Sequence, residues 1–176
     1  LKIIYLHQYF NTPKMSGGTR SYEMACRMVK KGHQVHMVTS KRNTSCKRRI
    51  WREEIIDGIN VYWLSVPYDN KMNFYKRLIA FFIYAFEAGR KAIAINGDIV
   101  FATSTPLTIA IPAIKTKKKL KIPMVFEVRD LWPELPIAIG AIKNPILIYL
   151  AKRLERWAYS NSNEIVVLSP GMSEGV

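Results

Sequence analysis

The hydrophobic positions of this chain fall into two kinds of segment that alternate along its length. Short runs rich in β-branched and aromatic residues predict strands. Longer segments with apolar residues three or four positions apart predict helices. The predicted strands are Lys2–His7, Gln34–Ser40, Arg52–Ile56, Ile59–Val66, Asp98–Ala102, Ile122–Val128 and Glu164–Leu168, and the predicted helices are Arg20–Lys31, Asn73–Ile95, Thr105–Leu120, Pro145–Asn161 and a further one starting at Ser169.

The order of these elements predicts the fold class. A strand, a helix and a second strand follow one another over residues 2–40, which is a right-handed crossover between parallel strands. Thr19 is placed to cap the helix at its start and Gly32 to end it. The pair Asp57-Gly58 predicts a hairpin turn. We therefore expect a doubly wound, mainly parallel, Rossmann-like α/β sheet with a β-hairpin insertion.

The helix predicted over Asn73–Ile95 has more apolar surface than one core face requires. Tyr75, Ile79 and Ile83 lie outside its main apolar face. Either protein covers two sides of the helix, or the additional surface rests on a membrane, with Lys71, Lys76 and Arg77 at lipid head groups. The main apolar face is expected to hold Phe74, Leu78, Phe81, Phe82, Ala85, Phe86, Gly89, Ala92 and Ile93.

Composition limits the class of protein and of partner. With 49% hydrophobic and 23% charged residues, a chain of 176 residues can form one ordinary globular domain. The 27 Lys+Arg against 13 Asp+Glu give a net charge of +14, which attracts polyanions. The basic clusters Lys41–Arg49 and Lys115–Lys121 lack the interleaved aromatic residues or recognition helix of a nucleic-acid interface, so no nucleic-acid partner is expected.

The sequence also indicates where the protein works. Two cysteines, Cys26 and Cys46, are too few for a disulfide framework or a metal cluster, so we expect free thiols in a reducing compartment. No signal-peptide pattern opens the chain. The longest apolar run, Leu78–Phe86, has nine residues, against the roughly 18 or more of a spanning helix. We expect a cytoplasmic protein, soluble or peripheral on a membrane.

The stretch Phe126–Glu134, FEVRDLWPE, carries the strongest chemical signal. A strand that should be buried ends in Glu127, Arg129 and Asp130, at the edge of the sheet where α/β proteins bind ligands. Asp130 could orient or deprotonate a hydroxyl group, and Arg129 could hold a phosphate. The alternative is an internal ion pair that stabilises a turn, and Trp132 fits a place in the core equally well.

A second candidate site precedes the first helix. Gly17 and Gly18 lie just before a helix N-terminus, with Arg20 nearby, and such a loop can cradle an anion. A turn that merely requires glycine is the alternative. The spacing does not match a dinucleotide fingerprint, so a nicotinamide enzyme is disfavoured. His7, at the tip of the first strand, could donate a hydrogen bond to a substrate oxygen or serve the structure alone.

Together these motifs resemble the N-terminal half of the family 4 glycosyltransferases, with the closest likeness to bacterial members that build cell-surface polysaccharides and lipopolysaccharides. The likeness extends over nearly the whole chain. It is carried by YLHQYF at Tyr5–Phe10, GGTR at Gly17–Arg20, KGHQV at Lys31–Val35, FEVRDLWPE at Phe126–Glu134 and VLSPGM at Val167–Met172.

The resemblance implies two Rossmann-like halves (a GT-B fold) with the active site between them, retention of anomeric configuration, and no bound metal or other cofactor. Residues 1–176 would be the N-terminal, acceptor-binding half. The C-terminal half, which binds the nucleotide-sugar, would lie outside this chain, so the chain alone should be inactive. Gly17, Gly18, Thr19 and Arg20 would meet the donor diphosphate.

The remaining candidate residues belong to the acceptor side. Asp130 and His7 would be the catalytic residues, and Glu127, Arg129 and Trp132 would bind the acceptor, a glycan linked to polyprenyl diphosphate on the inner membrane face. The alternative is a basic α/β module without catalysis that binds an anionic membrane or nucleic acid.

Overall fold

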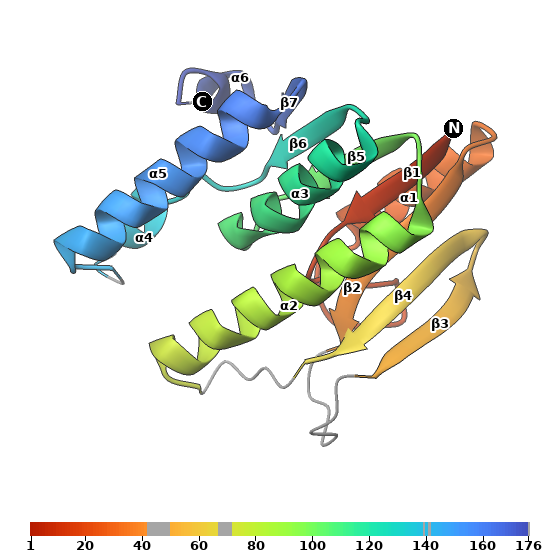
Figure 1. Ribbon diagram of the computed structural model, residues 1–176, viewed down its shortest axis with the longest axis horizontal. Coiled ribbons are helices and arrows are strands. Elements are labelled where there is room, and N and C mark those ends of the chain that lie inside the picture. Colours follow the sequence, from red (N-terminus) through yellow and green to blue (C-terminus); the bar gives the residue numbers. More distant parts are fainter. Residues whose placement is uncertain (42–49, 67–71, 139, 141, 176) are drawn as a thin grey trace.

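The computed structural model describes residues 1–41, 50–66, 72–138, 140 and 142–175 (Figure 1). Most of the predicted loop Lys41–Arg49, with Cys46, lies outside these residues, as does Lys71. Cys26 is a free thiol, as expected. Among the described residues, no helix is long and apolar enough to cross a bilayer.

The protein is built on one seven-stranded sheet in the order β3-β4-β2-β1-β5-β6-β7. Every neighbouring pair is parallel except β3 and β4, which form the predicted antiparallel hairpin through Asp57-Gly58. The hairpin extends the main sheet, because β4 pairs in parallel with β2. The strands are β1 (Lys2–Leu6), β2 (Gln34–Lys41), β3 (Trp51–Ile56), β4 (Ile59–Ser65), β5 (Ile99–Thr103), β6 (Met124–Val128) and β7 (Glu164–Val167).

Helices cover both faces of this sheet, as a doubly wound fold requires. Helix α1 (Arg20–Lys30) packs on one face, against Ile3 and Tyr5 of β1. The other face, with Ile4 and Leu6, is covered by three long helices (Figure 1). These are α2 (Phe74–Ile95), α3 (Ala110–Leu120) and α5 (Pro145–Asn161). The alternation of side chains along β1 thus feeds two hydrophobic clusters.

Three features of the helices differ from the predictions. Thr19 is the N-cap residue of α1, but its side chain makes no capping hydrogen bond. The helix expected from Thr105 begins instead with a 3₁₀ turn, η1 (Leu107–Ile109), which leads into α3. A short helix, α4 (Glu134–Ala138), was not predicted, because five residues with a proline inside them give no periodicity to detect. The helix expected at Ser169 is α6 (Pro170–Ser173).

The predicted apolar face of α2 is wrong in part. The helix buries Ala80, Tyr84, Ala88 and Ala92, whereas Phe82 and Phe86 are about half exposed (50% and 54%). Tyr84 also fixes the helix on the sheet, because its hydroxyl donates to the carbonyl oxygen of Val38 over 2.7 Å. Small residues let a helix approach a sheet closely, so the alanine stripe faces inward and the large side chains are left outside. Ala85, Gly89 and Ala92 are buried, as predicted.

Candidate functional site

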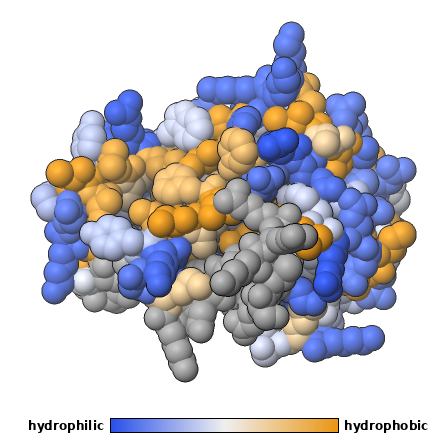
Figure 2. All heavy atoms as spheres, turned by 60° about the horizontal axis from the view of Figure 1, so that its bottom comes forward, coloured by the Kyte–Doolittle hydropathy of each residue, from blue (hydrophilic) through white to orange (hydrophobic). Residues whose placement is uncertain are grey.

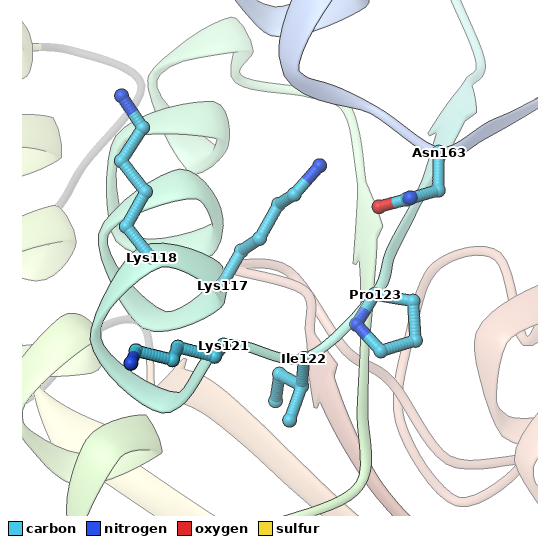
Figure 3. A pocket seen from close by; sticks show the side chains of 6 residues that line it. All are labelled: Lys117, Lys118, Lys121, Ile122, Pro123 and Asn163. Atoms are coloured by element: carbon cyan, nitrogen blue, oxygen red, sulfur yellow. The ribbon is translucent and has the colours of Figure 1, made fainter.

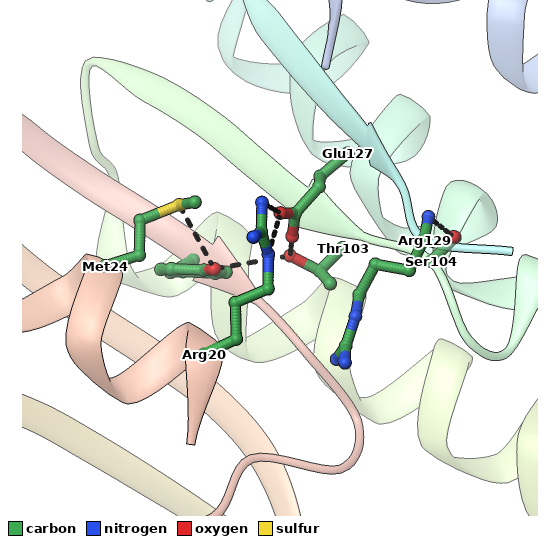
Figure 4. A network of polar contacts seen from close by, with 7 residues as sticks. Arg20, Met24, Thr103, Ser104, Glu127 and Arg129 are labelled. Atoms are coloured by element: carbon green, nitrogen blue, oxygen red, sulfur yellow. Dashed lines mark hydrogen bonds and ion pairs between the residues drawn. The ribbon is translucent and has the colours of Figure 1, made fainter. Parts of the chain in front are cut away.

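The candidate site lies at the carboxyl ends of β1, β5 and β6, beside the N-terminus of α1. Parallel strands place these ends at one edge of the sheet, the usual place for ligands in α/β folds. A direct contact joins the two stretches that the sequence singled out: the Arg20 guanidinium lies 2.8 Å from the Glu127 carboxylate (Figure 4). The glycine loop before α1 and the charged end of β6 therefore meet at the same edge of the sheet. We call this edge, with Gly17–Arg20 and Glu127–Asp130, the rim.

The ion pair is anchored beneath the surface. Arg20 donates from Nε to Oε1 of Glu127 over 2.9 Å, and the Thr103 hydroxyl donates to the other carboxylate oxygen over 2.9 Å. The Glu127 side chain is fully buried, whereas that of Arg20 is 43% exposed. Glu127 is thus a buried anion that fixes the guanidinium, and the exposed part of Arg20 still faces the rim. An acceptor contact by Glu127 itself would require this pair to open.

The hydrogen-bond network continues from Thr103 toward helix α1. The Thr103 hydroxyl lies 3.4 Å from the hydroxyl of Tyr5, which in turn lies 3.7 Å from Sδ of Met24 on α1. Burial, reinforced by the negative charge of Glu127, raises the pKa of Tyr5 to about 12. Tyr5 therefore contributes a neutral hydroxyl group to this network.

A separate set of contacts holds the turn after β6. The Thr105 hydroxyl donates to Oδ2 of Asp130 over 2.6 Å, and the backbone N–H of Arg129 donates to the Ser104 hydroxyl over 2.9 Å. Thr105 has a φ of +85°, which is rare for a β-branched residue. Strained backbone of this kind concentrates at functional sites. Asp130 and Arg129 are both half-buried, so each can be reached by a ligand at the rim.

The glycine loop has the backbone geometry of a turn and an open surface. Gly17 has a φ of +128°, which residues with a Cβ rarely adopt. Gly18 has an ordinary φ, and no atom lies within 4 Å of where its Cβ would be. Because the Thr19 side chain does not cap α1, backbone N–H groups at the start of the helix are left for another acceptor. An anion is a suitable acceptor at this position.

Gly17 and Gly18 form a matched pair for mutation. Gly17→Ala should lower the free energy of unfolding by about 1–2 kcal/mol, since the φ is unfavourable and the new Cβ would meet Nδ2 of Asn11 at 2.6 Å. Gly18→Ala should change it by less than about 0.5 kcal/mol. Urea unfolding of both variants measures the difference, and equal losses would contradict this description of the loop.

Two predicted site residues remain, and of these only His7 lies deep in the protein. His7 follows β1 directly and is 2% exposed, and its backbone N–H donates to the carbonyl oxygen of Val38. Trp132 is half-buried and packs against the hydrophobic cluster under α2 and α3. The structure thus places Arg20, Arg129 and Asp130 at the surface of the rim, with His7 and Glu127 beneath it.

Sequence reasoning missed the hydroxyl residues that support this rim. Thr103 is the last residue of β5, and Ser104 and Thr105 follow it. The three contact Glu127, Arg129 and Asp130 respectively. Their signal was visible in the sequence: three successive hydroxyl side chains follow a buried strand that pairs with the strand carrying the charged motif. Among the described residues, no group of three or more His, Cys, Asp or Glu side chains could hold a metal ion.

A pocket of about 440 Å³ lies at the opposite edge of the sheet (Figure 3). Ile122 and Pro123, which precede β6, line it together with Asn163 and three lysines, Lys117, Lys118 and Lys121. One of these ammonium groups is engaged, because Lys117 donates to the carbonyl oxygen of Asn161. The pocket is basic, but it shares no residue with the rim.

Comparison with known proteins identifies relatives of this fold. The family model for the glycosyl transferase 4-like domain matches residues 17–176. No curated protein sequence matches the chain significantly. The structure is similar to that of sucrose-phosphate synthase from Thermosynechococcus elongatus, with a TM-score of 0.65 and 12% identity over 99% of this chain and 44% of that one.

A second similar structure is described as trehalose-6-phosphate from E. coli bound with UDP-2-fluoro glucose. Its TM-score is 0.50, with 8% identity over 73% of this chain and 33% of that one. This chain therefore spans less than half the length of either structure. At such low identity the likeness shows the fold, which is the mainly parallel α/β sheet of GT-B glycosyltransferases.

Proposed function

Because this chain belongs to the family of glycosyl transferase 4-like domains, we propose that it is the acceptor-binding half of a retaining glycosyltransferase. The whole enzyme transfers a sugar from a nucleotide-sugar to a glycan linked to polyprenyl diphosphate, in the synthesis of a bacterial polysaccharide or lipopolysaccharide. The observation that carries the proposal is the contact between Arg20 and Glu127, which brings the glycine loop and the charged strand end to one rim.

The donor side of the proposed site is the glycine loop. The donor diphosphate binds the backbone N–H groups from Gly17 to Thr19, at the positive end of the α1 dipole. Arg20, held by Glu127, stabilises the negative charge that develops on the leaving diphosphate. A nucleotide-sugar donor is supported by the neighbouring structure described as bound with UDP-2-fluoro glucose. The proposal requires no metal ion and no other cofactor.

The acceptor side is the turn after β6. The acceptor oxygen forms a bond to the anomeric carbon, the bond from that carbon to the diphosphate oxygen breaks, and the diphosphate leaves with the electron pair. Asp130 orients the acceptor hydroxyl and accepts its proton as the new bond forms, because its carboxylate is half-buried and fixed by Thr105. Arg129 and Trp132 contact the acceptor glycan, and His7 supports the site from below.

The proposed acceptor places the enzyme in the cytoplasm, peripherally on the inner face of the plasma membrane. The net charge of +14 supports this location, since cytoplasmic leaflets are anionic. The rival function, a basic module without catalysis, would make the exposed lysines of α3 essential and Asp130 dispensable.

A transfer assay tests the proposed function. The full-length protein that contains these residues is incubated with radiolabelled nucleotide-sugars and membranes that supply lipid-linked acceptors. We expect label to enter the lipid extract from one donor, with retention at the anomeric carbon. The 176 residues alone should give no turnover, because they lack the donor-binding half. Turnover by them alone, or failure of the full-length protein with every donor tried, would contradict the proposal.

A further inference from the structure

Helix α2 presents a continuous row of large apolar side chains to solvent. Tyr75, Ile79, Phe82 and Phe86 recur at helical spacing, and each is at least half exposed. The opposite side of α2 is the alanine stripe that packs on the sheet. This outer row therefore adds nothing to the core, although it is as hydrophobic as a core face.

Helix α5 presents a second row of the same kind. Ile146, Tyr149, Leu150 and Trp157 are exposed, while Ala158 is fully buried against the sheet. Leaving so many large apolar groups on two helices of one layer is unusual for a surface that only meets water. In Figure 2, hydrophobic side chains gather on the left of the view, the side toward which α2 and α5 begin in Figure 1.

The two rows belong to one face of the molecule. Helix α3 lies between α2 and α5 (Figure 1), and its exposed lysines contact both. The Lys115 ammonium lies 5.1 Å from the centre of the Phe86 ring, and the Lys118 ammonium lies 5.9 Å from that of Trp157. Residues three apart on a helix share a side, so Phe86 and Trp157 flank the same outer ridge of α3.

The charges on this face are almost all positive. Arg90 on α2, Lys115, Lys118 and Lys119 on α3, and Lys152, Arg153 and Arg156 on α5 are exposed. The three helices carry two acidic residues, Glu87 and Glu155, and neither is exposed. We call the face formed by the two apolar rows and these cations the α2–α5 face.

We propose that the α2–α5 face docks on an anionic lipid bilayer. Tyr, Trp and Phe enter the boundary between head groups and acyl chains, and Lys and Arg meet the lipid phosphates. A bilayer fits better than a protein partner, because aromatic and basic groups cover all three helices and none of these helices has an exposed acidic side chain. The N-terminal halves of α2 and α5 reach past the carboxyl ends of the strands (Figure 1), so docking brings the rim close to the membrane surface.

This inference rests on the proposed function, because docking would give the enzyme access to a lipid-linked acceptor. Membrane binding itself can be measured without assaying sugar transfer. Flotation with vesicles of phosphatidylcholine, with and without about a third phosphatidylglycerol, measures binding of the purified full-length protein. We expect binding to the anionic vesicles, and a large loss at high salt, because exposed cations near an anionic surface each contribute about fivefold to the affinity.

Variants locate the surface. Ile79→Ser with Phe82→Ser, and Tyr149→Ser with Leu150→Ser, should each weaken vesicle binding about tenfold or more, because each removes exposed apolar side chains that would enter the interface. Ile55→Ser is the matched control, since Ile55 is 75% exposed on the edge strand β3. All three should fold like the original protein, as circular dichroism can verify.

Transfer to a short water-soluble acceptor glycan separates this proposal from the proposed function. The docking variants should retain that activity while they lose vesicle binding. Equal vesicle binding by the original protein and the variants would overturn the proposal that the α2–α5 face docks on the membrane, whether or not the variants are active. If neither the original protein nor any variant transferred sugar to the soluble acceptor, that result would instead count against the proposed function. Binding that DNA or RNA displaces, without any preference for anionic lipid, would identify a nucleic-acid surface and also overturn the proposal.

Discussion

Replacing Asp130 by alanine is expected to lower the rate of the proposed sugar transfer by the full-length protein about 100- to 10,000-fold, the usual contribution of a positioned acid or base. The reason is geometric: the Asp130 carboxylate is held at the rim by the Thr105 hydroxyl at 2.6 Å. Its other oxygen can then orient an acceptor hydroxyl. Steady-state kinetics with a soluble acceptor measure the effect, which should fall on kcat more than on KM.

Two further variants give this prediction its controls. Asp130→Asn keeps the shape and the contact with Thr105 but cannot take a proton, so it should be nearly as inactive as the alanine variant. Glu164→Ala removes an exposed carboxylate at the start of β7 and should leave turnover unchanged. A fully active Asp130→Asn variant would show that this side chain only positions the acceptor.

Removal of Arg20 should have the largest effect on stability. Arg20→Leu leaves the Glu127 carboxylate fully buried without its cation, and an uncompensated buried charge costs about 3–5 kcal/mol. Urea unfolding at neutral pH measures the loss. Adding Glu127→Gln should recover a large part of it, because the amide keeps a partner in Thr103 and carries no charge.

An exposed ion pair of this protein provides the matched comparison. Lys91 and Glu53 lie 2.6 Å apart, but the Glu53 side chain is 61% exposed. Glu53→Gln should therefore cost at most about 1 kcal/mol. If Arg20→Leu cost no more than Glu53→Gln, the buried pair would not anchor the rim.

Local chemistry made most of the fold predictable. The turn Asp57-Gly58 specifies the hairpin, and Gly32, with a φ of +81°, ends α1 as expected. The face of α2 was not predictable in the same way, because apolar residues occur all around its first half. Hydrophobic periodicity does not distinguish small from large apolar side chains, whereas close packing on a sheet favours small ones. Only Ala80, Ala88 and Ala92, whose spacings are multiples of four, indicate which face packs on the sheet.

The site was predictable as a set of residues but not as a set of contacts. Arg20 and Glu127 were both predicted as site residues, because one lies beside the glycine loop and the other near a strand end. The sequence does not show that they pair, since 107 positions separate them. Their pairing depends on the register of β1, β5 and β6, which brings α1 beside the end of β6. Thr103 joins the pair for the same reason, since β5 pairs with both neighbouring strands.

A nuclear magnetic resonance titration of the isotopically labelled full-length protein with inorganic pyrophosphate tests most directly whether the glycine loop and the charged strand end form one anion-binding rim. We expect the largest backbone amide shifts at Gly17, Gly18, Thr19 and the turn at Arg129 and Asp130, and we expect Gly17→Ala to weaken them. Shifts confined to the lysine pocket at Lys117, Lys118 and Lys121 (Figure 3), with the rim unchanged, would contradict this expectation.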